Sequence, residues 1–118
     1  MAVAKGWYEG RERQPLEFMM LIVSELAEAA ECVRKGEPFA WALGQTVVDR
    51  VATPTMITDF PTILKHGLKP EGELIELADA MIRIADYCGS KGWDLEAAIK
   101  LKMAYNATRP HRHGGKVV

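Results

Sequence analysis

The sequence predicts an all-helical protein, and three observations support this prediction. Apolar residues in most of the chain recur at the three- and four-residue spacing of amphipathic helices. Gly and Pro residues separate these stretches, and strand patterns are weak. The chain has 118 residues, of which 48% are hydrophobic, and this suits one domain over residues 1–118. Because a chain of this size is only marginally stable alone, we expect oligomerisation to complete its helical bundle.

The first helix is expected over about residues 15–35. Pro15 suits a first helical turn, and Gly36 follows the last one. The opening letters LEFMMLIV are apolar on almost every side. This helix is therefore expected to lie at the centre of the bundle.

Two further helices are expected near the C-terminus. One covers about residues 72–91, with apolar residues along one face and glycines at its end. Asp94 is an expected N-cap for the other, which covers about residues 95–108 and is stopped by Pro110.

The segment over residues 37–70 has no clear pattern. Pieces around Trp41–Val51 and Ile57–His66 are compatible with short helices, which prolines and glycines interrupt. We expect this segment to cover a ligand or to form subunit contacts.

Composition excludes several classes of protein. The 15 basic and 16 acidic residues are nearly balanced, unlike the charge of a typical nucleic-acid-binding domain. The longest apolar run, residues 18–23, is too short to span a membrane, and the N-terminus lacks a signal-peptide pattern. Cys32 and Cys88 do not make a disulfide framework, so a cytoplasmic protein is expected.

Four acidic residues are the candidate metal ligands. Glu25 and Glu28 lie three residues apart in the first long helix, and Glu76 and Asp79 have the same spacing in the second. This spacing puts both acids of a pair on one helix face. If the two helices pack together, the converging carboxylates would repel each other unless a cation joined them. Carboxylate ligands favour Mg²⁺, with Mn²⁺ as an alternative, over zinc.

The ordinary explanation of such pairs is a solvated helix surface. Glu25 argues against it, because this residue falls within the apolar arc of the first helix, where a carboxylate is rarely left unpaired. Asp86 lies two turns after Asp79 on the same stripe. It would serve as a further ligand or form an ion pair with Arg83, and the sequence favours neither.

Candidate substrate-binding residues lie in the last helix. Lys102, Tyr105, Asn106 and Arg109 share one helix face and offer cations and hydrogen-bonding groups suited to phosphate, sugar or base. The alternative is that the cations merely complement the helix C-terminus. A basic tail with a His-x-His sequence follows at residues 111–118, and a solvated tail explains it better than a metal site.

The order of these motifs carries a family resemblance. Glu25-Leu-Ala-Glu28 followed by Glu76-Leu-Ala-Asp79 resembles the paired acidic motif of MazG-like, all-α nucleoside triphosphate pyrophosphohydrolases. The letters KMAYNATRPHRHGGK, residues 102–116, are similar to the C-terminal signature of small phage and bacterial members. One departure is Ser24, which stands where many members carry a further Glu.

The resemblance implies a helical bundle that forms a homodimer or homotetramer. It also implies hydrolysis of a nucleoside triphosphate to the monophosphate and pyrophosphate. The four acids would bind Mg²⁺, and one of Glu25 and Glu28 would accept the proton of the attacking water. Lys102, Asn106 and Arg109, with Tyr105 beside them, would hold the nucleotide. The resemblance does not indicate which base or sugar the protein prefers.

Three other functions are alternatives to this one. A non-catalytic nucleotide-binding or oligomerisation module would keep the same fold. A di-iron bundle would need Glu-x-x-His pairs, and no motif Glu here has that partner. A nucleic-acid binder would depend on the basic tail and show steep salt dependence.

Overall fold

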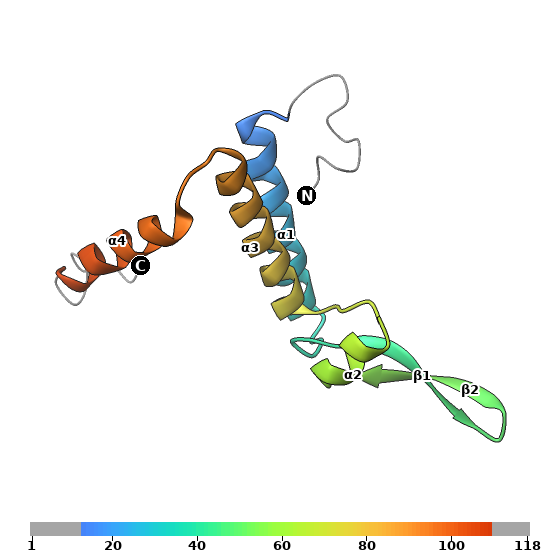
Figure 1. Cartoon of the computed structure of the whole chain (residues 1–118). Helices are drawn as coiled ribbons and strands as arrows, with labels where there is room; N and C mark the ends of the chain where they lie inside the picture. The colour runs from blue at the N-terminus through green and yellow to red at the C-terminus, as the bar shows by residue number, and fades with distance from the viewer. Residues whose placement is uncertain (1–12, 110–118) are drawn as a thin grey trace. The chain divides into compact units, whose positions relative to one another are not determined.

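The computed structural model describes residues 13–109 and shows a mainly helical protein with one β-hairpin (Figure 1). The chain divides into two compact units, residues 1–84 and 85–118. The described elements, in chain order, are α1 (Pro15–Arg34), β1 (Ala42–Val48), β2 (Val51–Ile57), α2 (Phe60–Lys65), α3 (Glu73–Ser90) and α4 (Leu95–Ala107). The predicted helical class is therefore confirmed, except that the prediction of an entirely helical chain missed the hairpin.

Helix α1 begins and ends where its local signals predict. Pro15 occupies its first position, and the Glu17 carboxylate accepts a hydrogen bond from the Gln14 backbone N–H (2.7 Å). At its end, Gly36 adopts a φ of +68°, a left-handed conformation that glycine tolerates without strain.

The hairpin corrects the expectation of a short helix around Trp41–Val51. Strands β1 and β2 are antiparallel, with Val48 opposite Val51. Asp49 and Arg50 form the turn with φ values of +53° and +68°, as a type I′ turn requires. Valine and threonine favour strands, and Pro54 opposes a helix interior, so the local preferences of these residues outweigh a weak helical pattern.

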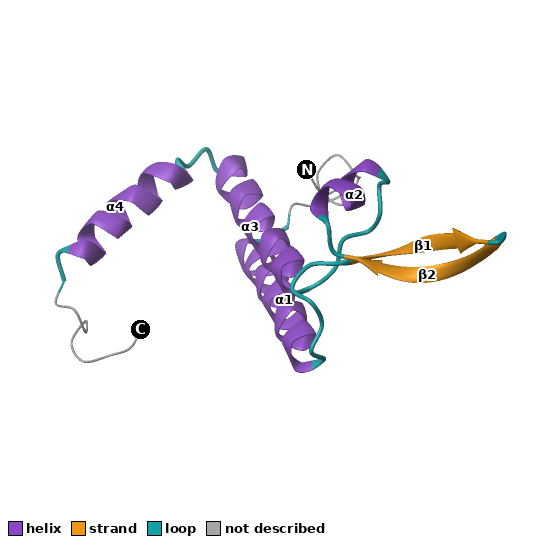
Figure 2. Cartoon of the chain, turned by 90° about the horizontal axis from the view of Figure 1, so that it is seen from below, coloured by secondary structure: helices purple, strands orange, loops and turns teal. Residues whose placement is uncertain are grey.

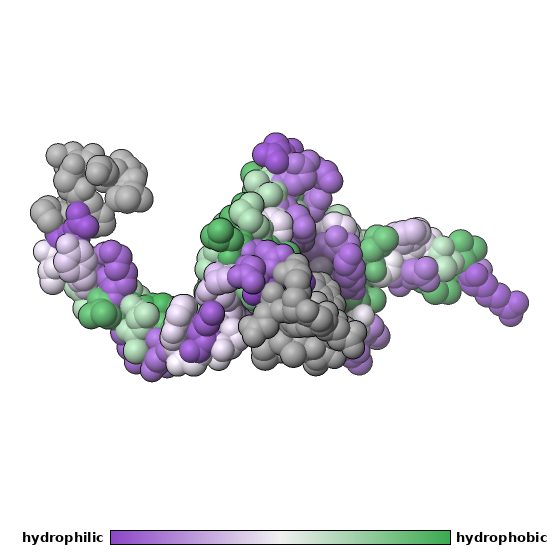
Figure 3. Space-filling view, turned by 90° about the horizontal axis from the view of Figure 1, so that it is seen from above, coloured by the Kyte–Doolittle hydropathy of each residue, from purple (hydrophilic) through white to green (hydrophobic). Residues whose placement is uncertain are grey.

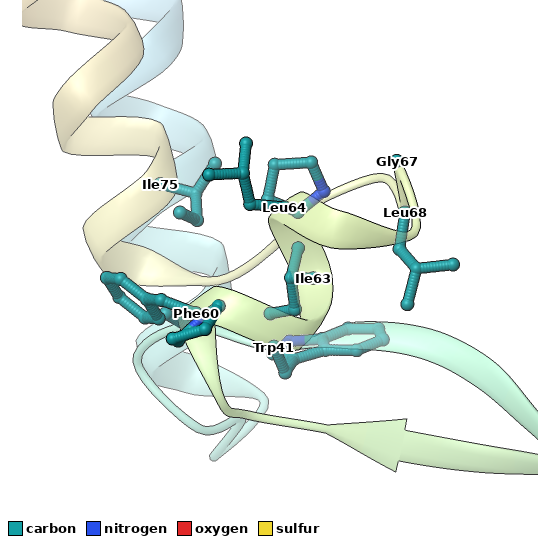
Figure 4. Close-up of a pocket in the computed structure, with 10 residues that line it drawn as sticks. Trp41, Phe60, Ile63, Leu64, Gly67, Leu68 and Ile75 are labelled. Carbon is teal, nitrogen blue, oxygen red and sulfur yellow. The ribbon is translucent and has the colours of Figure 1, made fainter.

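Helix α2 lies inside the predicted Ile57–His66 segment. It borders an apolar pocket of about 640 Å³ that is also lined by Trp41, just before β1, and by Ile75 near the start of α3 (Figure 4). Of the α2 residues that line the pocket, Ile63 is buried, whereas Phe60 and Leu64 are exposed. The pocket is lined by Ala40, Trp41, Phe60, Pro61, Ile63, Leu64, Gly67, Leu68, Pro70 and Ile75.

The start of α3 is tied to the start of the hairpin. Trp41 and Glu71 exchange two backbone hydrogen bonds of 2.9 and 2.7 Å. Gly72 has a φ of +115°, and a Cβ atom there would lie 2.6 Å from the Phe39 carbonyl oxygen. Only glycine fits this close approach, which sets where α3 begins.

Helices α1 and α3 lie side by side and antiparallel in both views (Figures 1 and 2). The single chain nevertheless buries little of α1: its buried residues are Glu25 and Ala29. Within the described part of the first unit α3 is the one long helix beside α1, so the expectation that α1 lies at the centre of a bundle is not met there. The large apolar side chains exposed at α1 are Leu16, Met19, Met20, Val23, Leu26 and Val33.

The second unit contains the end of α3 and all of α4. The Tyr87 and Trp93 rings meet edge to face, with centroids 5.8 Å apart. The Asp94 carboxylate accepts a hydrogen bond from the Ala97 N–H (2.9 Å), which confirms the predicted N-cap. Across residues 13–109, no helix has both the length and the apolar composition that crossing a membrane requires.

Candidate metal centre

The antiparallel arrangement of α1 and α3 brings acidic residues from both helices together. Carboxylate oxygens of Glu25, Glu76 and Asp79 all lie within 4.8 Å of one another. Glu25 is buried, with 7% of its surface exposed, Glu76 is half-buried, and Asp79 is exposed. The structure thus places three of the four predicted ligands in one cluster, with its buried side on α1 and its open side on α3.

Glu28, the fourth predicted ligand, also interacts with this cluster. Burial of the Glu76 carboxyl is the main reason why its pKa rises from 4.5 to about 7. Repulsion from Glu28 and hydrogen bonds with Glu25 and Glu28 raise the pKa further, as does repulsion from Asp79. In the absence of a cation, the cluster therefore holds a proton on Glu76 near neutral pH.

Arg83 supplies a positive charge to the cluster, a role that the sequence did not assign to it. Its Nε donates a hydrogen bond to Glu25 Oε2 over 2.8 Å. The sequence left open whether Asp86 is a further ligand or pairs with Arg83, and the structure shows Arg83 paired with Glu25. Arg83 lies seven residues after Glu76, two turns along the same stripe of α3. This shared stripe is the sequence pattern that places Arg83 near the acidic residues. Its partner, Glu25, is evident only when α1 lies against α3.

Cys32 lies near the cluster but does not change its chemistry. Burial raises the pKa of the Cys32 thiol, and the negative charges of Glu37 and Glu76 raise it further. The thiol therefore stays protonated at neutral pH, whereas a soft metal ion requires a thiolate. Among the described residues of the cluster, the negatively charged ligand atoms are therefore carboxylate oxygens.

The size and chemistry of the cluster fit a divalent cation. Oxygens on opposite sides of one Mg²⁺ lie about 4.2 Å apart, and those around one Ca²⁺ about 4.8 Å apart. The three carboxylates of the cluster come within this distance, so small side-chain movements would bring them around one ion. Glu25 keeps one carboxylate oxygen that does not accept from Arg83. Hard oxygen donors without His or Cys match Mg²⁺ or Mn²⁺ better than zinc.

Ser24 does not act as a substitute for the missing Glu. Its hydroxyl donates a hydrogen bond to the Leu21 carbonyl oxygen (2.7 Å), and the residue is exposed. Ser24 is therefore satisfied within its own helix, and Glu25 is the residue of α1 that is buried against α3.

The predicted substrate-binding face forms within the second unit. Lys102 Nζ lies 5.2 Å from the Tyr105 ring centroid, and Arg109 Cζ lies 5.5 Å from it. Tyr105 thus lies between two cations on one exposed face, in contacts of the cation–π type. Asn106 is also exposed, next to Tyr105 on the helix. These residues and Asp86 belong to the second unit, and the predictions for their roles stand apart from the acidic cluster.

The predictions for the basic tail, residues 111–118, lie outside the described residues. Neither a protein-family model nor a curated protein nor a solved structure matches this chain.

Proposed function

We propose that this protein is a Mg²⁺-dependent nucleoside triphosphate pyrophosphohydrolase with a fold of the all-α NTP pyrophosphatase type. The single observation that carries this proposal is the convergence of Glu25, Glu76 and Asp79 within 4.8 Å. Like charges meet at such distances when a cation joins them or when a proton or an arginine neutralises them. The motif resemblance supports the first of these explanations.

The acidic residues would hold the cation and handle the proton. When bound, Mg²⁺ would supply positive charge for triphosphate oxygens and would lower the pKa of a water molecule. Glu25 is buried and held by Arg83, so its carboxylate has a fixed direction. Glu28 is exposed and has no described arginine partner. Glu28 is therefore the freer of the two to accept a proton from water, and Glu25 the better positioned ligand.

The cationic face of α4 would bind the triphosphate. Lys102 and Arg109 would offset the charge on phosphate oxygens, since both are exposed and held near Tyr105. Asn106 and Tyr105 would offer hydrogen bonds to the nucleoside. This role rests on the sequence pattern and on the shared face within the second unit.

Homo-oligomerisation would complete the fold. The described core consists chiefly of alanines, while many large apolar side chains of α1 and α3 are exposed. A soluble monomer rarely exposes so many of these side chains on neighbouring helices. A second copy packed against this surface would form the rest of a helical bundle and enclose Glu25 more fully.

The direct test is pyrophosphate release from a panel of canonical and modified nucleoside triphosphates with Mg²⁺. Glu25→Gln and Asp79→Asn should each lower the rate by at least about 100-fold, since each removes a charged ligand. Glu31→Gln is the matched control, because Glu31 lies on α1 but is exposed and pairs with Arg34. Undiminished hydrolysis in both site variants would disprove the proposal.

A non-catalytic helical module is the second candidate, and the Arg83–Glu25 pair favours it. Arg83 and a proton on Glu76 neutralise part of the cluster without any metal. Such a module would bind nucleotide or assemble without turning it over. Nucleotide binding measured by calorimetry, with no product after prolonged incubation with Mg²⁺ or Mn²⁺, would favour this second function.

A further inference from the structure

The hairpin has two outer edges that differ in their capacity to pair with another strand. Because Asp49 and Arg50 form a two-residue turn, Val48 and Val51 are a hydrogen-bonded pair. Bonded and non-bonded pairs alternate from there, so Gln45 and Pro54 form a non-bonded pair. The backbone groups of non-bonded pairs face away from the partner strand.

The outer edge of β2 is blocked by Pro54. Proline has no N–H to donate, and its ring occupies the position from which an added strand would bond. Pro54 therefore protects the edge of β2 from pairing with another strand.

The outer edge of β1 is open over three residues. Trp41 lies on this edge and is already bonded to Glu71. The next outward-facing residues are Leu43, Gln45 and Val47, whose backbone groups bond no other described residue. The turn begins at Asp49, so the free edge is centred on Gln45.

Side chains on this edge are uncharged and largely apolar. Leu43 is 60% exposed and Val47 64% exposed. Neither strand carries a charged residue, and the apolar residues of the hairpin form patches behind its hydrophilic tip (Figure 3). Two-stranded sheets of this kind are marginal alone, whereas a third strand stabilises them.

We propose that the open edge of β1 is an interface between two copies of this chain, in which the two β1 strands pair antiparallel about a two-fold axis at Gln45. This register sets Leu43 opposite the partner subunit's Val47, an apolar cross-strand pair. It sets Gln45 opposite Gln45 of the partner subunit, where each side-chain amide both donates and accepts. The three outward residues of each strand then form six backbone hydrogen bonds in one four-stranded sheet.

A second copy is the occupant because the edge is complementary to itself. Its free length is symmetric about Gln45, and no charge on either strand opposes like charge across the axis. The interface does not involve the acidic cluster. An experiment that disproves the interface therefore leaves the proposed hydrolase activity untouched, and the reverse also holds.

Cross-linking tests the register. The variant Gln45→Cys is made in a Cys32→Ser, Cys88→Ser background and oxidised under mild conditions. The axis would bring the α-carbons of the two introduced cysteines to about 5.5 Å, a distance that a disulfide spans. The matched control is Ala52→Cys, on the blocked edge and the same face of the hairpin. We expect a covalent dimer to form at least ten times faster from Gln45→Cys, and equal rates would overturn the proposal.

Amide hydrogen exchange on the unmodified chain tests the same interface without relying on any variant. The N–H groups of Leu43, Gln45 and Val47 should exchange at least tenfold more slowly than those of Ala52 and Met56, and this protection should diminish on dilution. Free exchange of all five at every concentration would overturn the proposal. Protection of these groups in a sample that is monomeric would do the same, because it would assign the edge to a partner within one chain.

Discussion

The Arg83 guanidinium donates to Glu25 across the α1–α3 contact over 2.8 Å, and this joins the two helices at their most buried charged residue. Arg83 itself is one-third exposed. The pair therefore lies between a surface ion pair and a fully buried one. Its main effect is to give a buried carboxylate a charged hydrogen-bond partner in a place where water does not solvate it well.

Replacing Arg83 should lower the stability of the protein. Arg83→Met leaves the Glu25 carboxylate without its charged partner, and we expect a loss of about 1–3 kcal/mol in the free energy of unfolding, measured with urea at neutral pH. Arg83→Lys keeps the charge without the planar guanidinium and should lose less. Equal stability of Arg83→Met and the unmodified protein would show that the pair contributes nothing.

The stability of the metal-free protein should depend on pH through Glu76. The folded state holds the Glu76 proton up to about pH 7, whereas an ordinary Glu carboxyl releases it near 4.5. Between these values the folded state binds more protons, so its stability should fall as pH rises from about 4.5 to 7 and level off above that. Thermal melts in EDTA across this range would reveal the slope. Glu76→Gln should remove it, and an unchanged slope in that variant would contradict the assignment.

Divalent cations should stabilise the fold. A cation that binds only the folded state adds about 2.7 kcal/mol at one hundred times its dissociation constant. Mg²⁺ or Mn²⁺ should therefore raise the melting temperature at pH 7.5, and EDTA should reverse the rise. Asp79→Asn should abolish this response, while Glu31→Gln, on the exposed side of α1, should retain it. A response of the same size in both variants would place the cation elsewhere.

The hairpin turn should gain stability from glycine. Arg50 adopts a φ of +68°, which costs free energy for a residue with a Cβ atom. Arg50→Gly relieves this strain and creates an Asp-Gly pair suited to a type I′ turn, so we expect a gain of about 0.5–1 kcal/mol. Arg50→Ala retains the Cβ atom and should bring no gain. Urea unfolding of the two variants gives the comparison.

Two glycines with positive φ should respond differently to alanine. At Gly72 an added Cβ atom meets the Phe39 carbonyl oxygen at 2.6 Å, whereas at Gly67 nothing lies within 4 Å. Gly67→Ala should therefore cost only the conformational strain, about 1 kcal/mol, and Gly72→Ala at least twice as much. Because Gly72 sets the start of α3, its variant should also weaken the Mg²⁺ response. Similar losses at both positions would argue against the close approach.

Local chemistry predicted the long helices well. Pro15, Gly36 and Asp94 mark helix ends through their own backbone preferences, which act without distant partners. The hairpin was missed because its strands lack a clean alternation of apolar and polar residues, which is the main sequence pattern of a half-buried strand. The turn at Asp49 and Arg50 gave little warning, since neither residue is glycine.

The sequence by itself determined the helical class, the N-cap of α4 and the inward position of Glu25, because helical periodicity and end chemistry involve residues a few positions apart. Tertiary structure alone decided that Glu25, Glu76 and Asp79 share one space and that Arg83 pairs with Glu25. It also decided which hairpin edge stays open. These outcomes depend on how segments distant in the chain meet, and no spacing within one helix or strand contains that information.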